Sequence, residues 1–121
     1  MANPVVHFEV LGKNADKLQS FYKDVFNWQL TPAVPGYAMA HPGTGINGGI
    51  GGDQSAGAGR VTFYVEVNDL DATLRNIEKR GGRTVQPPDA VPNGPTIALF
   101  SDPEGHIIGL VKAGSGPQGN A

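Results

Sequence analysis

One arrangement of sequence patterns occurs twice along this chain of 121 residues, and it restricts the possible folds more than any other feature. Each copy begins with a strand of alternating apolar residues, continues with an amphipathic helix and ends in three extended segments. The first copy begins with VVHFEV at residue 5, and the second begins with VTFYVEV at residue 61. The copies share few identical residues, so the repeated order of elements itself predicts an internal duplication.

The helix of the first copy is predicted between an N-cap at Asn14 and a stop at Asn27. Its apolar face, at helical spacing, consists of Leu18, Phe21, Tyr22 and Val25. The extended segments that follow are WQLTP, GYAMAH and GINGGIG, and glycine or proline turns separate them.

The helix of the second copy is expected to end at Gly81 and Gly82, because paired glycines suit a helix terminus. Its apolar face consists of Leu70, Leu74 and Ile77. The strand RTVQ, the proline-rich loop PPDAVPNGP and the strand TIALF come next. The turn SDPEG, with the Asp-Pro start typical of a type I turn, leads into the last strand, HIIGLV.

The two copies align with His7 opposite Thr62 and with Gly49 opposite Gly109. When a helix covers one face of a set of strands, the strands curve, and their other face becomes concave. Two such modules therefore predict an α+β fold in which a curved, mixed sheet of eight strands has a concave cavity. We expect one domain at residues 1–112, modules at about 5–52 and 60–112, and a flexible tail at 113–121.

Composition excludes several classes of protein. The formal net charge of −2 argues against a nucleic-acid-binding protein, which usually has a basic surface. Cysteine is absent, so the chain has neither disulfides nor a thiol nucleophile. No apolar run is long enough to cross a membrane, and the first residues do not resemble a signal peptide. We therefore expect a cytoplasmic protein without a membrane partner.

Three stretches of the sequence resemble the vicinal oxygen chelate superfamily, which includes glyoxalase I, bleomycin-resistance proteins and extradiol dioxygenases. They are HFEV…LQSFYKDVFNW, VEVNDLDATLRNIEKRGG and FSDPEGHIIGLV, and the likeness extends over about residues 5–112. The resemblance implies two paired βαβββ modules around a cup-shaped cavity and a small-molecule ligand. It also implies a homodimer. By helical spacing, the candidates for the core or the dimer interface are Phe21, Tyr22, Phe26 and Trp28.

In metal-dependent members, four ligands come from the first and last strands of the modules. Carried over by motif, these positions are His7, Gly49, Thr62 and Gly109. Only His7 is a good ligand, whereas a catalytic metal normally needs about three protein ligands, so we expect no metal cofactor. A displaced site is the alternative, and its donors would be His7, Glu9, Glu66 and His41.

Alternation along the strands predicts which residues face the cavity. The predicted ligand-binding residues are His7, Glu9, Tyr37, Met39, Thr62, Tyr64, Glu66 and Phe100. The two glycines, with Ile107, are expected to leave the cavity floor open. His106 is expected to face away and is left out of the site.

Each polar candidate has two interpretations. His7 is either a histidine satisfied by a neighbouring side chain or a ligand-contacting, catalytic acid–base group. Glu9 and Glu66 are either hydrogen-bonded carboxylates at the rim or groups that attract a cationic ligand. Tyr64 is expected to form part of the wall.

Three functional hypotheses follow. The first is a metal-free protein that binds a small molecule, as the bleomycin-resistance proteins do. The second is a lyase, isomerase or hydrolase that uses His7 and a carboxylate without metal. The third is a glyoxalase-like enzyme with relocated metal ligands.

Overall fold

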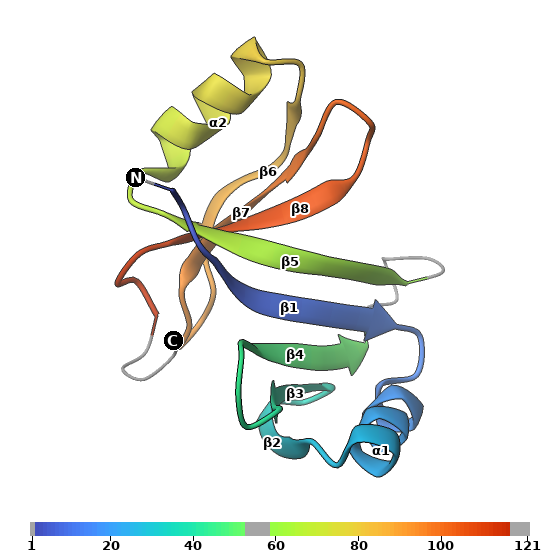
Figure 1. Ribbon diagram of the computed structural model, residues 1–121. Helices are drawn as coiled ribbons and strands as arrows, with labels where there is room; N and C mark the ends of the chain where they lie inside the picture. The colour runs from blue at the N-terminus through green and yellow to red at the C-terminus, as the bar shows by residue number, and fades with distance from the viewer. Residues whose placement is uncertain (1, 53–58, 117–121) are drawn as a thin grey trace. The chain divides into compact units, whose positions relative to one another are not determined.

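The computed structural model describes residues 2–52 and 59–116, which contain two helices and eight strands. The first module consists of β1 (Val5–Gly12), α1 (Ala15–Phe26), β2 (Gln29–Val34), β3 (Tyr37–His41) and β4 (Asn47–Gly52). The second consists of β5 (Arg60–Val67), α2 (Leu70–Lys79), β6 (Arg83–Ala90), β7 (Thr96–Ser101) and β8 (Ile107–Lys112) (Figure 1). This order confirms the predicted α+β class and the βαβββ plan of both modules.

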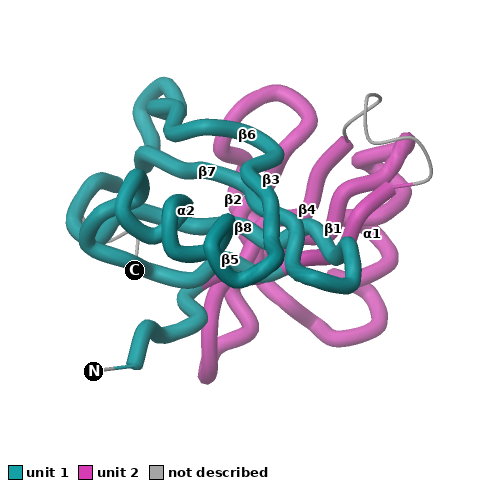
Figure 2. The backbone as a smooth tube through the Cα atoms, turned by 90° about the horizontal axis from the view of Figure 1, so that it is seen from above, with its two compact units in different colours: residues 1–6, 63–121 teal, residues 7–62 magenta. Residues whose placement is uncertain are grey.

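The chain divides into two compact units (Figure 2). One unit consists of residues 7–62, and the other consists of residues 1–6 and 63–121. The division falls inside β1 and β5, so it does not coincide with the predicted module boundaries. The predicted extent of a single domain, residues 1–112, stays a prediction.

In the first module the strands follow the order β2-β3-β4-β1. β1 pairs parallel with β4, and the other pairs are antiparallel. Its apolar core is formed by Val10, Ala40 and Ile50, against which Phe8, Leu18, Tyr22, Trp28 and Leu30 pack. Gly48 lies directly under the ring of Phe8, where even a Cβ atom would not fit.

Both predicted ends of α1 are confirmed. The side chain of Asn14 accepts a hydrogen bond from the amide of Lys17, which satisfies one of the unpaired amides of the first turn. Asn27 ends the helix in the left-handed conformation, with φ of 59°. The predicted apolar face is only partly buried, because Phe21 and Val25 remain 55% and 56% exposed.

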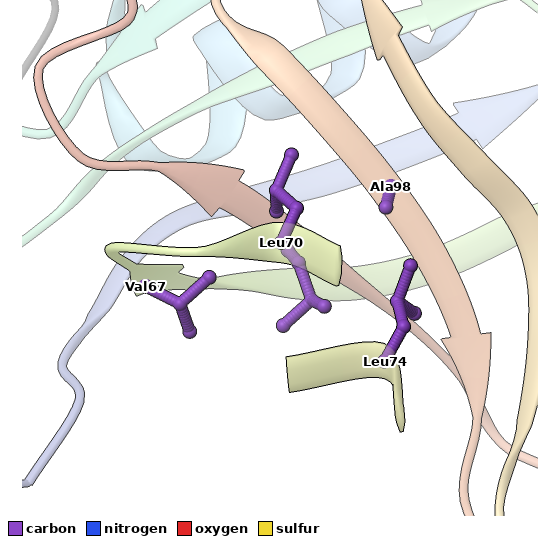
Figure 3. Close-up of a cluster of buried hydrophobic side chains, with 5 residues drawn as sticks. Val67, Leu70, Leu74 and Ala98 are labelled. Carbon is purple, nitrogen blue, oxygen red and sulfur yellow. The ribbon is translucent and has the colours of Figure 1, made fainter. Parts of the chain in front are cut away.

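The second module repeats this plan with the order β5-β8-β7-β6, in which β5 and β8 are parallel. Helix α2 packs against β6, β7 and β8 (Figure 1). Its leucines point into an apolar cluster (Figure 3), which consists of Val67, Leu70, Leu74, Ala98 and Leu110. The helix ends as predicted, since the amides of Gly81 and Gly82 bond back to the carbonyls of Glu78 and Ile77.

Strand registers confirm the alignment of the two copies. Glu9 pairs with Gly49 across β1 and β4, and Tyr64 pairs with Gly109 at the equivalent place across β5 and β8. The next residues of β4 and β8, Ile50 and Leu110, are fully buried in the two cores. The duplication is therefore structural as well as a pattern in the sequence.

The predicted proline-rich loop is wrong in its first half. Strand β6 continues through Pro87 and Pro88 to Ala90, with a shift of register between Gln86 and Asp89. Proline is tolerated there because β6 ends the strand order of its module, so its missing amide breaks no inner ladder.

Hydrogen bonds hold the turn at Asp102 and the first residues of the predicted tail. The amide of Gly105 donates to the carbonyl of Asp102, as the predicted type I turn requires. The predicted flexible tail begins at 113, yet Ala113 donates to Val67, and Ser115 accepts from the amide of Thr96. Residues 117–121 of this tail lie outside the described residues. Neither helix of the described part is long and apolar enough to cross a membrane.

Candidate functional site

Three predicted site residues form a hydrogen-bonded row within residues 7–62. The hydroxyl of Tyr37 lies 3.1 Å from Nε2 of His7 and donates to Oε2 of Glu9 at 3.0 Å. Alternation along β1 places His7 and Glu9 on the face opposite Val10, which belongs to the core. The row, named here the His7–Tyr37–Glu9 row, therefore lies on the face of the first module that α1 does not cover.

Glycines of β4 make this row possible, because Tyr37 starts on β3 and must extend over β4 to contact residues of β1. A Cβ atom on Gly51 would lie 2.7 Å from the ring of Tyr37 and 2.6 Å from the carbonyl oxygen of Gly36. A Cβ atom on Gly49 would overlap the hydroxyl of Tyr37. The bare backbone of β4 is thus the surface on which the tyrosine lies.

The expectation that glycines leave the floor open is wrong in both modules. Tyr37 covers Gly49, and the ring of Tyr64 covers Gly109 so closely that a Cβ atom there would overlap it. Each position is one at which the resemblance implies a metal ligand. In this chain each holds an aromatic ring in place of a side chain of its own.

Burial sets the protonation of the row. Burial in an environment of low polarity disfavours the imidazolium and lowers the pKa of His7 from 6.5 to about 4. His7 is therefore neutral at pH 7. Because the hydroxyl of Tyr37 donates its proton to Glu9, it accepts from His7, which assigns the Nε2–H tautomer to the imidazole. The carboxyl group that ends the row is buried, since Glu9 is only 8% exposed.

Other predicted site residues divide between the two units. Met39 pairs with Gly49 and shares the face of Tyr37 by alternation, and Thr62, 5% exposed, belongs to the same unit. Tyr64 and Glu66 belong to the other unit. There Tyr64 packs with Leu99 and Val111 as an apolar wall, on the face of the second module that α2 does not cover.

The prediction for Phe100 is corrected by its packing. Phe100 packs against the α2 cluster, whereas its neighbour Leu99 belongs to the cluster around Tyr64. Phe100 is therefore on the helix side of the second module. His106, which was left out of the site, is exposed and pairs with Asp102 at 3.0 Å. Its amide also donates to that carboxylate, and this hydrogen bond is the main cause that lowers the pKa of Asp102.

The donor set does not fit the metal centre that the resemblance implies. Of its four positions only His7 is a good ligand, and the two glycine positions lie under tyrosine rings. Of the displaced set, His7 and Glu9 come together around Tyr37 within residues 7–62, and Glu66 belongs to the other unit. Within residues 2–52 and 59–116, no three His, Cys, Asp or Glu side chains gather as a metal site.

Fold, internal duplication and strand register together define the class of protein. Residues 5–110 match the Glyoxalase/Bleomycin resistance protein/Dioxygenase superfamily, and the chain belongs to this superfamily. This confirms the resemblance noted in the sequence.

Individual relatives agree with this assignment. A glyoxylase-like domain-containing protein from Didymella fabae is 25% identical over 111 residues, which cover 81% of this chain and 84% of that protein. Methylmalonyl-CoA epimerase from Mycobacterium tuberculosis has a TM-score of 0.65 at 20% identity, covering 89% of this chain and 86% of its own. A superfamily member from Vibrio splendidus 12B01 has a TM-score of 0.65 at 18% identity, covering 92% and 99%. The two structures establish the fold.

Sequence reasoning placed Tyr37 near the site but missed its role as the link between His7 and Glu9. The available signal was the pair of glycines, Gly49 and Gly51, spaced two apart on one face of a strand next to the tyrosine's own. That spacing leaves a strip of bare backbone on which an aromatic ring can lie.

Proposed function

We propose that this protein binds a small organic molecule on the polar face of its first module, without a divalent metal. The observation that carries the proposal is the hydroxyl of Tyr37, which fills the space above Gly49 and joins His7 to Glu9. A side chain at position 49 that could hold a metal has no room. The polar atoms of this face are suited to hydrogen bonding instead.

The chemistry of this face indicates the kind of ligand. His7 is neutral at pH 7, and Glu9 supplies a buried carboxyl group whose oxygen accepts a hydrogen bond. Met39 adds apolar surface on the same face. A neutral or cationic molecule with hydrogen-bond donors and an apolar part matches these groups. A strongly anionic ligand does not, since the row itself offers it no positive charge.

Metal content and thermal stability test this proposal together. Untagged protein purified without chelator should contain far less than one divalent ion per chain by mass spectrometry, and added Mn²⁺, Ni²⁺ or Zn²⁺ should not raise its Tm. One tightly held ion per chain would refute the metal-free proposal and favour a glyoxalase-like enzyme with relocated ligands.

A library of neutral and cationic small molecules should contain compounds that raise the Tm. A ligand present at 100 times its Kd stabilises the folded state by about 2.7 kcal/mol. For a molecule bound at the row, Tyr37→Phe should weaken this effect. Tyr22→Phe is the matched control, because Tyr22 packs in the aromatic cluster of α1. If both variants lost the ligand-induced rise in Tm to the same extent, the ligand would bind elsewhere.

A second candidate function is a metal-free lyase, isomerase or hydrolase. The arrangement of His7, Tyr37 and Glu9 favours it, because a neutral imidazole backed by a hydrogen-bonded carboxylate is suited to general base catalysis. One structural neighbour is named an epimerase, which is an isomerase. Mass spectrometry of a bound compound after incubation separates the two: a binding protein returns it unchanged, and an enzyme returns a product.

We also infer a homodimer. The α1 helix exposes Phe21, Val25 and Phe26, each between 53% and 56% exposed, next to the stacked rings of Tyr22 and Trp28. Such an apolar patch is typical of an interface. Sedimentation should give twice the mass of the chain, and Phe21→Lys should give the mass of one chain.

A further inference from the structure

We propose that α1 pairs with α1 of a second copy of this chain, antiparallel and centred on Phe21, so that Lys17 of each copy contacts Asp24 of the other. This inference rests on the homodimer inferred above and specifies its contact surface. The surface, named here the α1 dimer face, consists of Lys17, Phe21, Asp24 and Val25.

Helical spacing brings the four side chains of the α1 dimer face together. With 3.6 residues per turn, the other three lie within about 60° of Phe21 around the helix axis. All four are exposed, and the exposed fractions of Phe21 and Val25 are 55% and 56%. Leu18 and Tyr22, in contrast, pack against the core of the first module. The α1 dimer face is therefore directed away from the core that α1 covers.

The two charges of this face oppose the dipole of their own helix. Lys17 lies in the first turn of α1 and Asp24 in the last. A helix favours negative charge at its N-terminus and positive charge at its C-terminus. Asp16 and Lys23, on the side of the helix opposite Phe21, follow this preference. The charges beside Phe21 are thus disfavoured within their own helix, and a partner of complementary charge offsets that cost.

Lys17 and Asp24 cannot satisfy each other within one chain. They are seven residues apart, which is about 10.5 Å along the helix axis. Neither forms an ion pair within residues 2–52 and 59–116.

The order of the charges selects a second copy of the same helix as the partner. A two-fold axis beside Phe21 reverses the helix direction and keeps both charged side chains on the same side of the pair. Lys17, four residues before Phe21, then lies next to Asp24 of the second copy, which is three residues beyond its Phe21. Symmetry makes this pair twice. A parallel arrangement would instead bring each charge next to its own equivalent, so the pattern favours the antiparallel one.

Charge reversal tests this pairing, with the dimer Kd measured by sedimentation equilibrium at low ionic strength. Lys17→Glu and Asp24→Lys each bring like charges together twice, and each should raise the Kd at least about tenfold. Both changes agree with the helix dipole, so a loss of dimer would not come from a loss of α1. Lys23→Glu is the matched control, because it changes the net charge equally on the opposite side of the helix. Its Kd should stay within about threefold of the wild type.

A mixture of the two reversed variants gives the sharper result. Equal amounts of Lys17→Glu and Asp24→Lys should form a dimer with one chain of each, because both cross-pairs then join opposite charges. Native mass spectrometry identifies this dimer by its mass.

Three results would overturn the pairing: a wild-type Kd in either reversed variant, an equal rise of the Kd in Lys23→Glu, or a mixture that stays monomeric. In each case a wild-type dimer would still support the homodimer inferred above and would place its interface elsewhere. A wild-type protein that sediments as a monomer would refute the homodimer itself. The two inferences can therefore fail separately.

Discussion

The hydroxyl of Tyr37 occupies the space that a side chain at Gly49 would need. The same relationship holds in the second module, where Tyr64 covers Gly109. In each case a glycine of the module's last strand supports a tyrosine from another strand. The two modules thus fill equivalent positions with aromatic rings, and in the first module the ring also brings a hydroxyl to His7 and Glu9.

Gly49→Ala should destabilise the protein strongly, because its new methyl group would overlap the hydroxyl of Tyr37 and force the ring off β4. Overpacking of this kind costs about 1–3 kcal/mol, before any loss of the hydrogen bonds of the row. Gly52→Ala, on the same strand, is the control, since its methyl group would make only ordinary contact with Ala15. Urea denaturation measures both, and equal free energies of unfolding would contradict the packing described here.

Tyr37→Phe should lower the free energy of unfolding by about 1–3 kcal/mol, because it removes a hydroxyl that pairs with both His7 and Glu9. The ring and its contacts with β4 remain. Tyr22→Phe should be close to neutral, because among the described residues the hydroxyl of Tyr22 makes no hydrogen bond. Thermal unfolding compares the stabilities of the two variants directly. A larger loss of stability in Tyr22→Phe would show that the row contributes little to the stability of the fold.

Much of the fold was predictable because it depends on local chemistry. The caps of α1 at Asn14 and Asn27 follow from side chains that suit helix ends, and the turn at Asp102 follows from the Asp-Pro pair. The continuation of β6 through Pro87 and Pro88 was not predictable in this way. Whether a proline can remain in a strand depends on the position of that strand at an edge, which is a property of the assembled sheet.

For the site, the sequence could predict only on which face of its strand each residue lies. Alternation correctly put His7, Glu9 and Tyr37 on a common side of the first module. The contact between them depends on a ring that crosses a neighbouring strand, and no periodicity in one strand contains that information. Phe100 was misplaced because TIALF is apolar on both faces, so alternation could not decide which residue faces α2.

The free energy of unfolding should depend on pH because the imidazole of His7 is buried. The pKa of His7 is about 4 in the folded protein and 6.5 in the unfolded chain, so the unfolded chain binds more protons between these values. The contribution of neutral His7 to the free energy of unfolding is complete above pH 6.5. About 3 kcal/mol of it is lost as the pH falls toward 4.

Chemical denaturation at steps of pH measures this loss, and His7→Gln should remove most of it. His106→Gln is the control, because that side chain is 71% exposed. The pKa of Asp102 is lowered from 3.8, chiefly by the hydrogen bond from the amide of His106, so its titration falls below the range in question. If the free energy of unfolding of His7→Gln still fell between pH 6.5 and 4 as in the wild type, the effect would belong to another group.

Substitutions at two neighbouring residues of β7 should affect opposite faces of the second module. Phe100→Ala should cost about 2–3 kcal/mol, below the cost for a fully buried ring because Phe100 is only partly buried. It should speed hydrogen exchange of the α2 amides and leave the NMR signals of the Tyr64 ring in place. Leu99→Ala should shift the Tyr64 signals, since the two side chains pack together, and should affect α2 less. If Phe100→Ala moved the Tyr64 ring instead, Phe100 would belong to the face that the sequence predicted for it.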